Sequence, residues 1–124
     1  MYYSEQEIER LVRDFESCAI AKTDFHHREH LTVAVWYLQT LSRGEAVDRM
    51  RAGLLRFIEH HGVDPKKYSE EVTVFWVDAV ASRLEGMGSE TQLLEKVNQI
   101  ILSFSSTART PAARVEDEES LAKS

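Results

Sequence analysis

Apolar residues recur three and four positions apart along most of the chain, and this spacing is compatible with few structures other than α-helices. Residues three and four apart share one face of a helix, because each turn takes about 3.6 residues. In the first run, from Ser4 to Ala21, one stripe holds the apolar residues Ile8, Leu11, Val12, Phe15, Cys18 and Ala19. Ser4 and Glu7 stand at the spacing of an N-terminal capping box. The run therefore predicts an amphipathic helix.

Four further runs repeat this pattern over residues 26–42, 45–61, 69–85 and 89–104, and Ser69 and Ser89 are suitable caps for the last two. The second run has the widest apolar face, so we expect it to lie centrally. The stretch VTVFWV within the fourth favours a strand by composition, but its flanks keep helical spacing. We therefore expect an all-α fold: a single-domain bundle of about five helices over residues 1–104.

Residues 105–124 are small and polar with an acidic cluster, so we expect a flexible tail.

The net charge of -6 disfavours a nucleic-acid partner, because a phosphate backbone requires a basic surface. No apolar run approaches the roughly 18 residues that span a bilayer, and the first residues do not resemble a signal peptide. A single cysteine, Cys18, agrees with a reducing compartment, and its place on the apolar stripe predicts burial. We expect a cytoplasmic protein without a membrane partner, and a helical face could support a homodimer.

Three of the five histidines lie in the stretch FHHREHL, at the start of the second predicted helix. On that helix His27 and His30 fall on the same stripe as Leu31 and Ala34, which should face the core. His26 lies about 100 degrees around the helix from His27 and is expected at the helix end. An imidazole nitrogen can bind a metal ion or accept a proton. His27 and His30 are therefore the first candidates for a functional site.

Two histidines rarely hold a metal ion tightly, so a carboxylate is expected from another helix start. With Trp76 as the centre of the apolar face of the fourth helix, Thr73 lies about 60 degrees away and Glu70 about 120 degrees away. Glu71 points about 140 degrees the other way. We therefore expect Glu70 to face inward, with Thr73 and Tyr68 beside it. This site requires the N-terminal ends of the second and fourth helices to meet, as parallel packing of these helices would allow.

Two versions of a small-molecule enzyme or binding protein follow from this arrangement. In the metal version, His27, His30 and Glu70 bind a divalent transition metal such as zinc, iron or manganese, and open positions hold water or substrate. In the metal-free version, one of the two histidines is a general base oriented by Glu70 or Glu29. Tyr68 or Thr73 would then donate a hydrogen bond to the substrate. A small-molecule ligand is expected in either version.

Structural roles compete with this interpretation. Histidines near a helix start can cap the helix or be satisfied by a neighbouring carboxylate. His60 and His61, in the last turn of the third helix, are expected to be structural. The alternative function is therefore a non-enzymatic helical module for regulation or protein–protein interaction, whose histidines stabilise the second helix.

The strings FHHREHLTVAVWYL and YSEEVTVFW resemble a family of small all-helical bacterial proteins, largely uncharacterised, with the pattern F-x-H-x-x-H-L-x-V-A-x-x-Y-L and a later Y-H-E-T-I-T. The likeness covers residues 25–84, and these residues fall on positions of the pattern: His27, His30, Tyr37, Glu70, Thr73 and Trp76. The chain departs from it at Ser69, where the family tends to have histidine, and at His26, where it tends to have threonine. The resemblance implies an all-helical fold and a functional first turn of the second helix, and it supplies no reaction.

Overall fold

Five α-helices form the protein in a computed structural model that describes residues 2–88 and 90–105. They are α1 (Glu5–Glu16), α2 (His27–Leu38), α3 (Arg43–His60), α4 (Glu70–Glu85) and α5 (Leu93–Ser105), with 3-10 turns at Lys22–Asp24 and Pro65–Lys67. These residues include no strand, so the predicted all-α bundle of about five helices is confirmed. The predicted flexible tail lies, apart from residue 105, outside the described residues. Among the described helices, none is long and apolar enough to cross a membrane.

Serine side chains set where three of the helices begin. The Ser4 hydroxyl accepts a hydrogen bond from the Glu7 backbone N–H at 3.3 Å, and Ser69 accepts one from Val72 at 3.2 Å. Both predicted caps are confirmed. Ser42 caps α3 in the same way, so α3 begins at Arg43, before the expected start, and α2 ends at Leu38, before the expected end. The predicted cap at residue 89 lies outside the described part of the chain.

Helix α1 ends at Glu16, five residues before the end expected from the sequence. The backbone of Cys18 adopts a φ of 61°, in the left-handed region that stops an α-helix. Cys18 is nevertheless buried, as predicted, and its thiol lies 3.7 Å from the backbone oxygen of Arg56 on α3. The apolar stripe thus continues beyond the helix in sequence, and the turn returns this side chain to the core.

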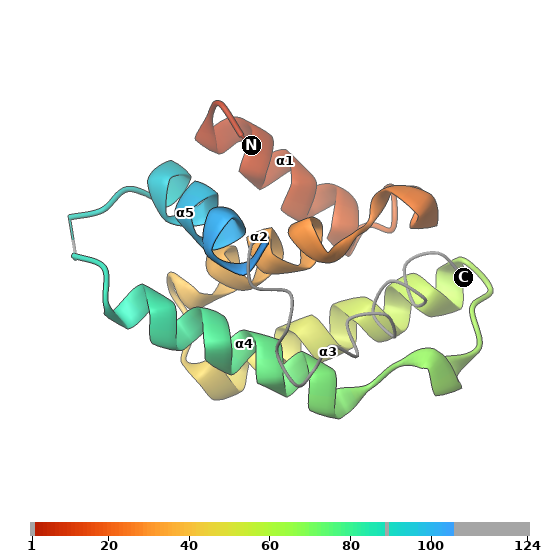
Figure 1. The fold of residues 1–124 in the computed structure, drawn as a ribbon. Coiled ribbons are helices and arrows are strands. Elements are labelled where there is room, and N and C mark those ends of the chain that lie inside the picture. The colour runs from red at the N-terminus through yellow and green to blue at the C-terminus, as the bar shows by residue number, and fades with distance from the viewer. Residues whose placement is uncertain (1, 89, 106–124) are drawn as a thin grey trace.

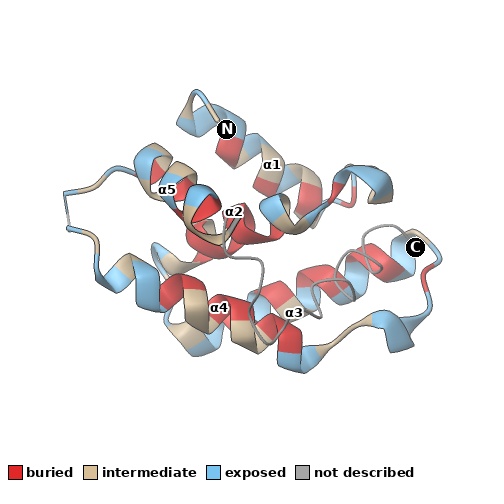
Figure 2. Ribbon diagram, in the orientation of Figure 1, coloured by how far each residue is buried: buried red, intermediate tan, exposed pale blue. Residues whose placement is uncertain are grey.

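Helix α2 occupies the centre of the bundle, as its wide apolar face predicts (Figure 1). It contacts each of the other four helices, with α1 and α5 on one side and α3 and α4 on the other. Its residues from His30 to Val35 are all buried, and the buried faces of the other helices turn toward it (Figure 2). Polar side chains within this buried segment, those of His30 and Thr32, therefore lie inside the protein.

Helices α2 and α4 run in the same direction. Near their N-terminal ends, the rings of His27 and Trp76 are in contact, with centroids 4.4 Å apart. At their C-terminal ends, Leu38 of α2 lines one hollow together with Ala81 and Leu84 of α4. The first turns of α2 and α4 therefore lie side by side, as the histidine hypothesis requires.

Candidate functional site

His30 is buried within the aromatic part of the core, with 4% of its surface exposed. Its ring meets the edge of Phe25 at a centroid distance of 4.5 Å, and Phe25 stacks on Phe15 at 4.8 Å. Phe57 completes this cluster, 5.1 Å from Phe25. The aromatic packing fixes the orientation of the imidazole, because neighbouring rings leave it little freedom to rotate.

His27 and His26 take different roles at the start of α2. His27 is half-buried, and its ring contacts the Trp76 ring at 65°. His26 is exposed and is the N-cap residue, and its backbone N–H donates to the Glu29 carboxylate at 2.8 Å. The predicted helix-end position of His26 is confirmed. Glu29 therefore caps α2, and its predicted role in orienting a histidine stays a prediction.

His30 lines a small internal cavity between α2, α3 and α4 together with Thr73 and Trp76. The remaining walls are apolar and consist of Leu31, Ala34, Met50, Leu54 and Val77. The space open to the centre of a water molecule is about 10 Å³, which corresponds to one water. The Thr73 hydroxyl, which is also buried, donates to the Ser69 backbone oxygen at 3.1 Å, so its lone pairs can still accept a hydrogen bond.

Trp76 brings a hydrogen-bond donor to the lining of this cavity. Its side chain is 4% exposed, and its Nε1 atom has no hydrogen-bond acceptor among residues 2–88 and 90–105. Buried N–H groups nearly always have an acceptor, and leaving one without costs about 1–3 kcal/mol. The sequence predicted the burial of Trp76 from the apolar spacing of α4. No sequence pattern could predict that its N–H would lack an acceptor within the described part of the chain.

The expectation of an inward-facing Glu70 is wrong. Its side chain is 47% exposed and forms a two-point ion pair with Arg51 of α3, at 2.9 Å (Nε to Oε1) and 2.7 Å (Nη2 to Oε2). Tyr68 also donates to the Glu70 carboxylate, at 2.8 Å. These hydrogen bonds, those from Arg51 foremost, lower the pKa of Glu70 to about 2. An angle of about 120 degrees from Trp76 places Glu70 at the edge of the apolar face, where the partner is α3 rather than α2.

Tyr68 connects Glu70 to the cavity. Burial raises its pKa to about 12, so its hydroxyl is protonated at neutral pH. Besides donating to Glu70, the hydroxyl lies within hydrogen-bonding reach of Thr73, which opposes the rise. The structure therefore gathers His27, His30, Tyr68 and Thr73 around the first turns of α2 and α4. The Glu70 side chain, in contrast, points toward Arg51 on α3 and lies outside this group.

The residues as arranged do not fit a metal ion. Both oxygens of Glu70 are engaged by Arg51, and Tyr68 adds a third hydrogen bond. Across the described residues, no group of three or more His, Cys, Asp or Glu side chains is placed to hold a metal. The metal version of the site stays a prediction. Sequence reasoning missed Arg51, because its pairing depends on how α3 packs on α4 and leaves no sign in local spacing.

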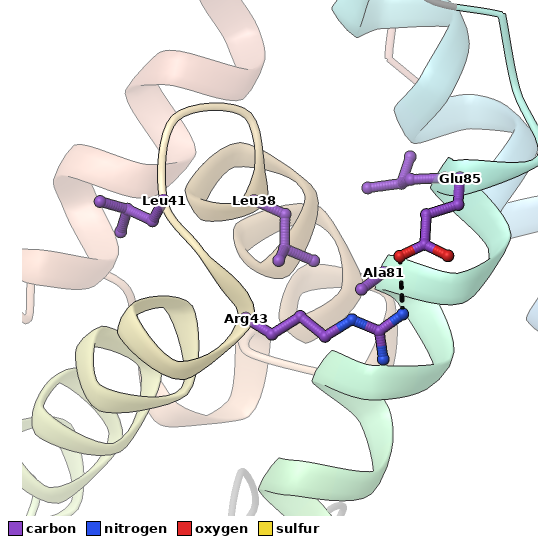
Figure 3. Close-up of a pocket in the computed structure, with 6 residues that line it drawn as sticks. Leu38, Leu41, Arg43, Ala81 and Glu85 are labelled. Atoms are coloured by element: carbon purple, nitrogen blue, oxygen red, sulfur yellow. Dashed lines mark hydrogen bonds and ion pairs between the residues drawn. The ribbon is translucent and has the colours of Figure 1, made fainter.

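A second hollow of about 260 Å³ lies at the C-terminal ends of α2 and α4 (Figure 3). Its apolar walls are Leu38, Leu41, Ala81 and Leu84. Arg43 reaches across it from the start of α3 and donates to Glu85 at 2.8 Å, with Asp78 at 3.6 Å. Two carboxylates thus surround one guanidinium, so this hollow offers no excess positive charge to an anionic ligand.

No model of a known protein family matches the chain, and neither a curated protein nor a solved structure does. The geometry of the side chains is therefore the basis for inferring what the protein binds.

Proposed function

We propose that the chain is a small-molecule-binding protein whose ligand accepts a hydrogen bond from Trp76 in the cavity between α2, α3 and α4. The observation that supports this is the buried indole N–H of Trp76, which lacks an acceptor among the described residues and belongs to a cavity-lining side chain. An internal donor of this kind is costly to folding, and such costs are often retained at binding sites. A bound acceptor would remove the cost.

The lining indicates the chemistry of the ligand. Five apolar side chains surround the polar groups of His30, Thr73 and Trp76, a composition typical of sites for small, largely neutral molecules. The cavity has room for about one polar atom, so a larger group enters only if a wall yields. Met50 is the best candidate to yield, because a methionine side chain is unbranched and adaptable. We expect a neutral ligand with one carbonyl-like or similar acceptor.

The same arrangement of side chains would also suit catalysis without a metal ion. His30 could accept a proton from a bound substrate while Thr73 or Tyr68 donates a hydrogen bond. His27 would line the approach beside Trp76, where their rings are in contact. The predicted cytoplasmic location, the lack of a nucleic-acid partner and a homodimer remain predictions, based on the composition and the net charge of -6.

A thermal-shift assay with small acceptor molecules, namely dimethyl sulfoxide, acetone and acetamide, tests the proposal. At ten times its Kd a ligand stabilises the native state by about 1.4 kcal/mol, which raises Tm by roughly 5 °C. We expect this rise for at least one probe in the wild type and its loss in Trp76→Phe and Thr73→Val. Trp36→Phe is the matched control, because Trp36 is half-buried and does not line the cavity. Equal shifts in all four proteins, or none, would contradict the proposal.

Two other interpretations are a metal-binding site and a non-enzymatic interaction module. Elemental analysis of protein purified without chelator tests the first of them. The proposal predicts equal metal content in the wild type, His27→Ala and His30→Ala. Stoichiometric metal that disappears from both variants would instead support the metal version. If both variants lose stability while the response to the probes is unchanged, the histidines are structural. If, in addition, the wild type responds to none of the probes, the interaction module is favoured.

A further inference from the structure

A third hollow lies where the end of α1, the last turns of α2 and the middle of α3 meet. Its volume is about 280 Å³, far larger than that of the cavity at Trp76. The lining is Glu16, Tyr37, Arg49, Ala52, Gly53 and Arg56. None of these residues lines the Trp76 cavity, so the two sites are independent.

Two small residues of α3 line this hollow. Ala52 and Gly53 form its wall, with Arg49 before them and Arg56 after them. A Cβ atom at Gly53 would stand only 2.6 Å from the Phe15 ring, so the glycine also lets α1 approach α3 closely. Along α3, Ala52 and Gly53 thus lie between two long cationic side chains, those of Arg49 and Arg56.

Arg49 and Arg56 both contact Glu16, the last residue of α1. They stand seven positions apart on α3, which places them on one stripe two turns apart. Arg49 lies 3.6 Å from the Glu16 carboxylate, and Arg56 donates to the Glu16 backbone oxygen at 2.9 Å. Tyr37, which is 4% exposed, donates its hydroxyl to the Glu16 carboxylate at 2.6 Å. The short bond from Tyr37, rather than the long contact with Arg49, is the main polar contact of Glu16.

The hollow therefore has an excess of positive charge and of donors. Two guanidinium groups with five N–H donors each face a single carboxylate. The ion pair of Arg49 is long and its partners are 60% and 38% exposed, so an incoming anion can displace it at little cost. This local excess contrasts with the net charge of -6 of the whole chain. A guanidinium binds carboxylate and phosphate groups through paired hydrogen bonds.

We propose that this hollow binds a small molecule through its oxyanion, a carboxylate or phosphate group held between Arg49 and Arg56. The rest of the ligand would lie against Ala52, Gly53 and the Tyr37 ring. A purely structural ion-pair network would also join α1, α2 and α3 through Glu16. Such a network gains nothing from an open volume of about 280 Å³ between its members, whereas a ligand requires one.

NMR titration of the ¹⁵N-labelled full chain tests this proposal with inorganic phosphate and with succinate, each against sodium chloride at equal ionic strength. We expect saturable shifts of the backbone N–H signals of Ala52 and Gly53 with at least one of the two anions. Comparing phosphate with succinate decides which oxyanion is preferred. Arg49→Gln and Arg56→Gln should each weaken the binding at least tenfold. Arg10→Gln, which alters an exposed arginine on α1, should leave it unchanged.

Three results would overturn the proposal. One is the absence of saturable shifts with both anions. Another is equal binding by the wild type and both glutamine variants. The third is a lower Tm in the variants, with no anion response in the wild type, which would show a structural network only. Arg49 is 60% exposed, so Arg49→Gln is expected to fold and to keep the test decisive if Arg56→Gln does not.

Discussion

Gly53 shows at the scale of one residue how tightly α1 and α3 are packed. Gly53→Ala would bring a Cβ atom to 2.6 and 2.8 Å from two atoms of the Phe15 ring. Phe15 cannot retreat easily, because it stacks on Phe25 at 4.8 Å. We expect a loss of about 1–3 kcal/mol in the free energy of unfolding, the usual cost of overpacking.

Urea denaturation measures this loss, with Gly44→Ala as the control. A Cβ atom at Gly44 meets nothing within 4 Å, so that variant should be neutral or slightly stabilised. If Gly53→Ala were as stable as Gly44→Ala, the close approach of Phe15 to α3 would be refuted.

Helical periodicity predicts the position of Trp76 correctly and that of Glu70 wrongly. Periodicity predicts the burial of His30, Thr73 and Trp76, because it depends only on which face of a helix meets the core. It cannot decide the partner of a residue at the edge of that face. Helical spacing therefore places Glu70 near the histidines, whereas in the structure it pairs with Arg51, nineteen positions earlier.

At the scale of an element, the start of α4 depends on Ser69, whose hydroxyl accepts from the Val72 N–H at 3.2 Å. Ser69→Ala removes this cap and should lower the free energy of unfolding by about 1 kcal/mol. Ser69→Asp keeps an acceptor at the same position and should restore most of the stability, as urea denaturation of the two variants will show. Equal stability of Ser69→Ala and wild type would show that the cap contributes nothing.

The ends of the helices were less predictable than the helices themselves. Ser4 and Ser69 are recognisable caps, and both begin a helix. The end of α1 was missed because Cys18 is a non-glycine residue in the left-handed region, for which the sequence carries no warning. The early end of α2 follows from the cap at Ser42, which makes the chain extended just before α3. Local spacing thus predicts a helix well, whereas its ends depend on neighbouring turns.

At the scale of the whole molecule, the pair of Arg51 and Glu70 ties α3 to α4 and makes stability depend on pH. The pKa of Glu70 is about 2 in the folded protein, against an ordinary value of 4.5. Because the folded pKa is lowered, the pair stabilises the protein fully above pH 4.5, and this contribution disappears as the pH falls toward 2. The partners are 37% and 47% exposed, so solvent screening reduces this contribution to stability.

Unfolding free energies of the wild type and Glu70→Gln between pH 4.5 and pH 2 test this dependence. The wild type should lose more stability over that range than the variant, because only the wild type has the carboxylate to protonate. Glu71→Gln, which alters the exposed neighbouring residue, should follow the wild type. The same pH dependence in all three proteins would show that the pair does not contribute.

The most direct test of the account is the NMR signal of the Trp76 indole N–H during titration with dimethyl sulfoxide and acetone. Only two indole signals are expected, from Trp36 and Trp76, and Trp76→Phe assigns them. If a ligand acceptor enters the cavity lined by His30 and Thr73, the Trp76 signal will shift saturably while that of Trp36 stays nearly constant. A Trp76 signal that does not move, or that moves linearly in parallel with Trp36, would contradict the central claim that this cavity binds a small molecule.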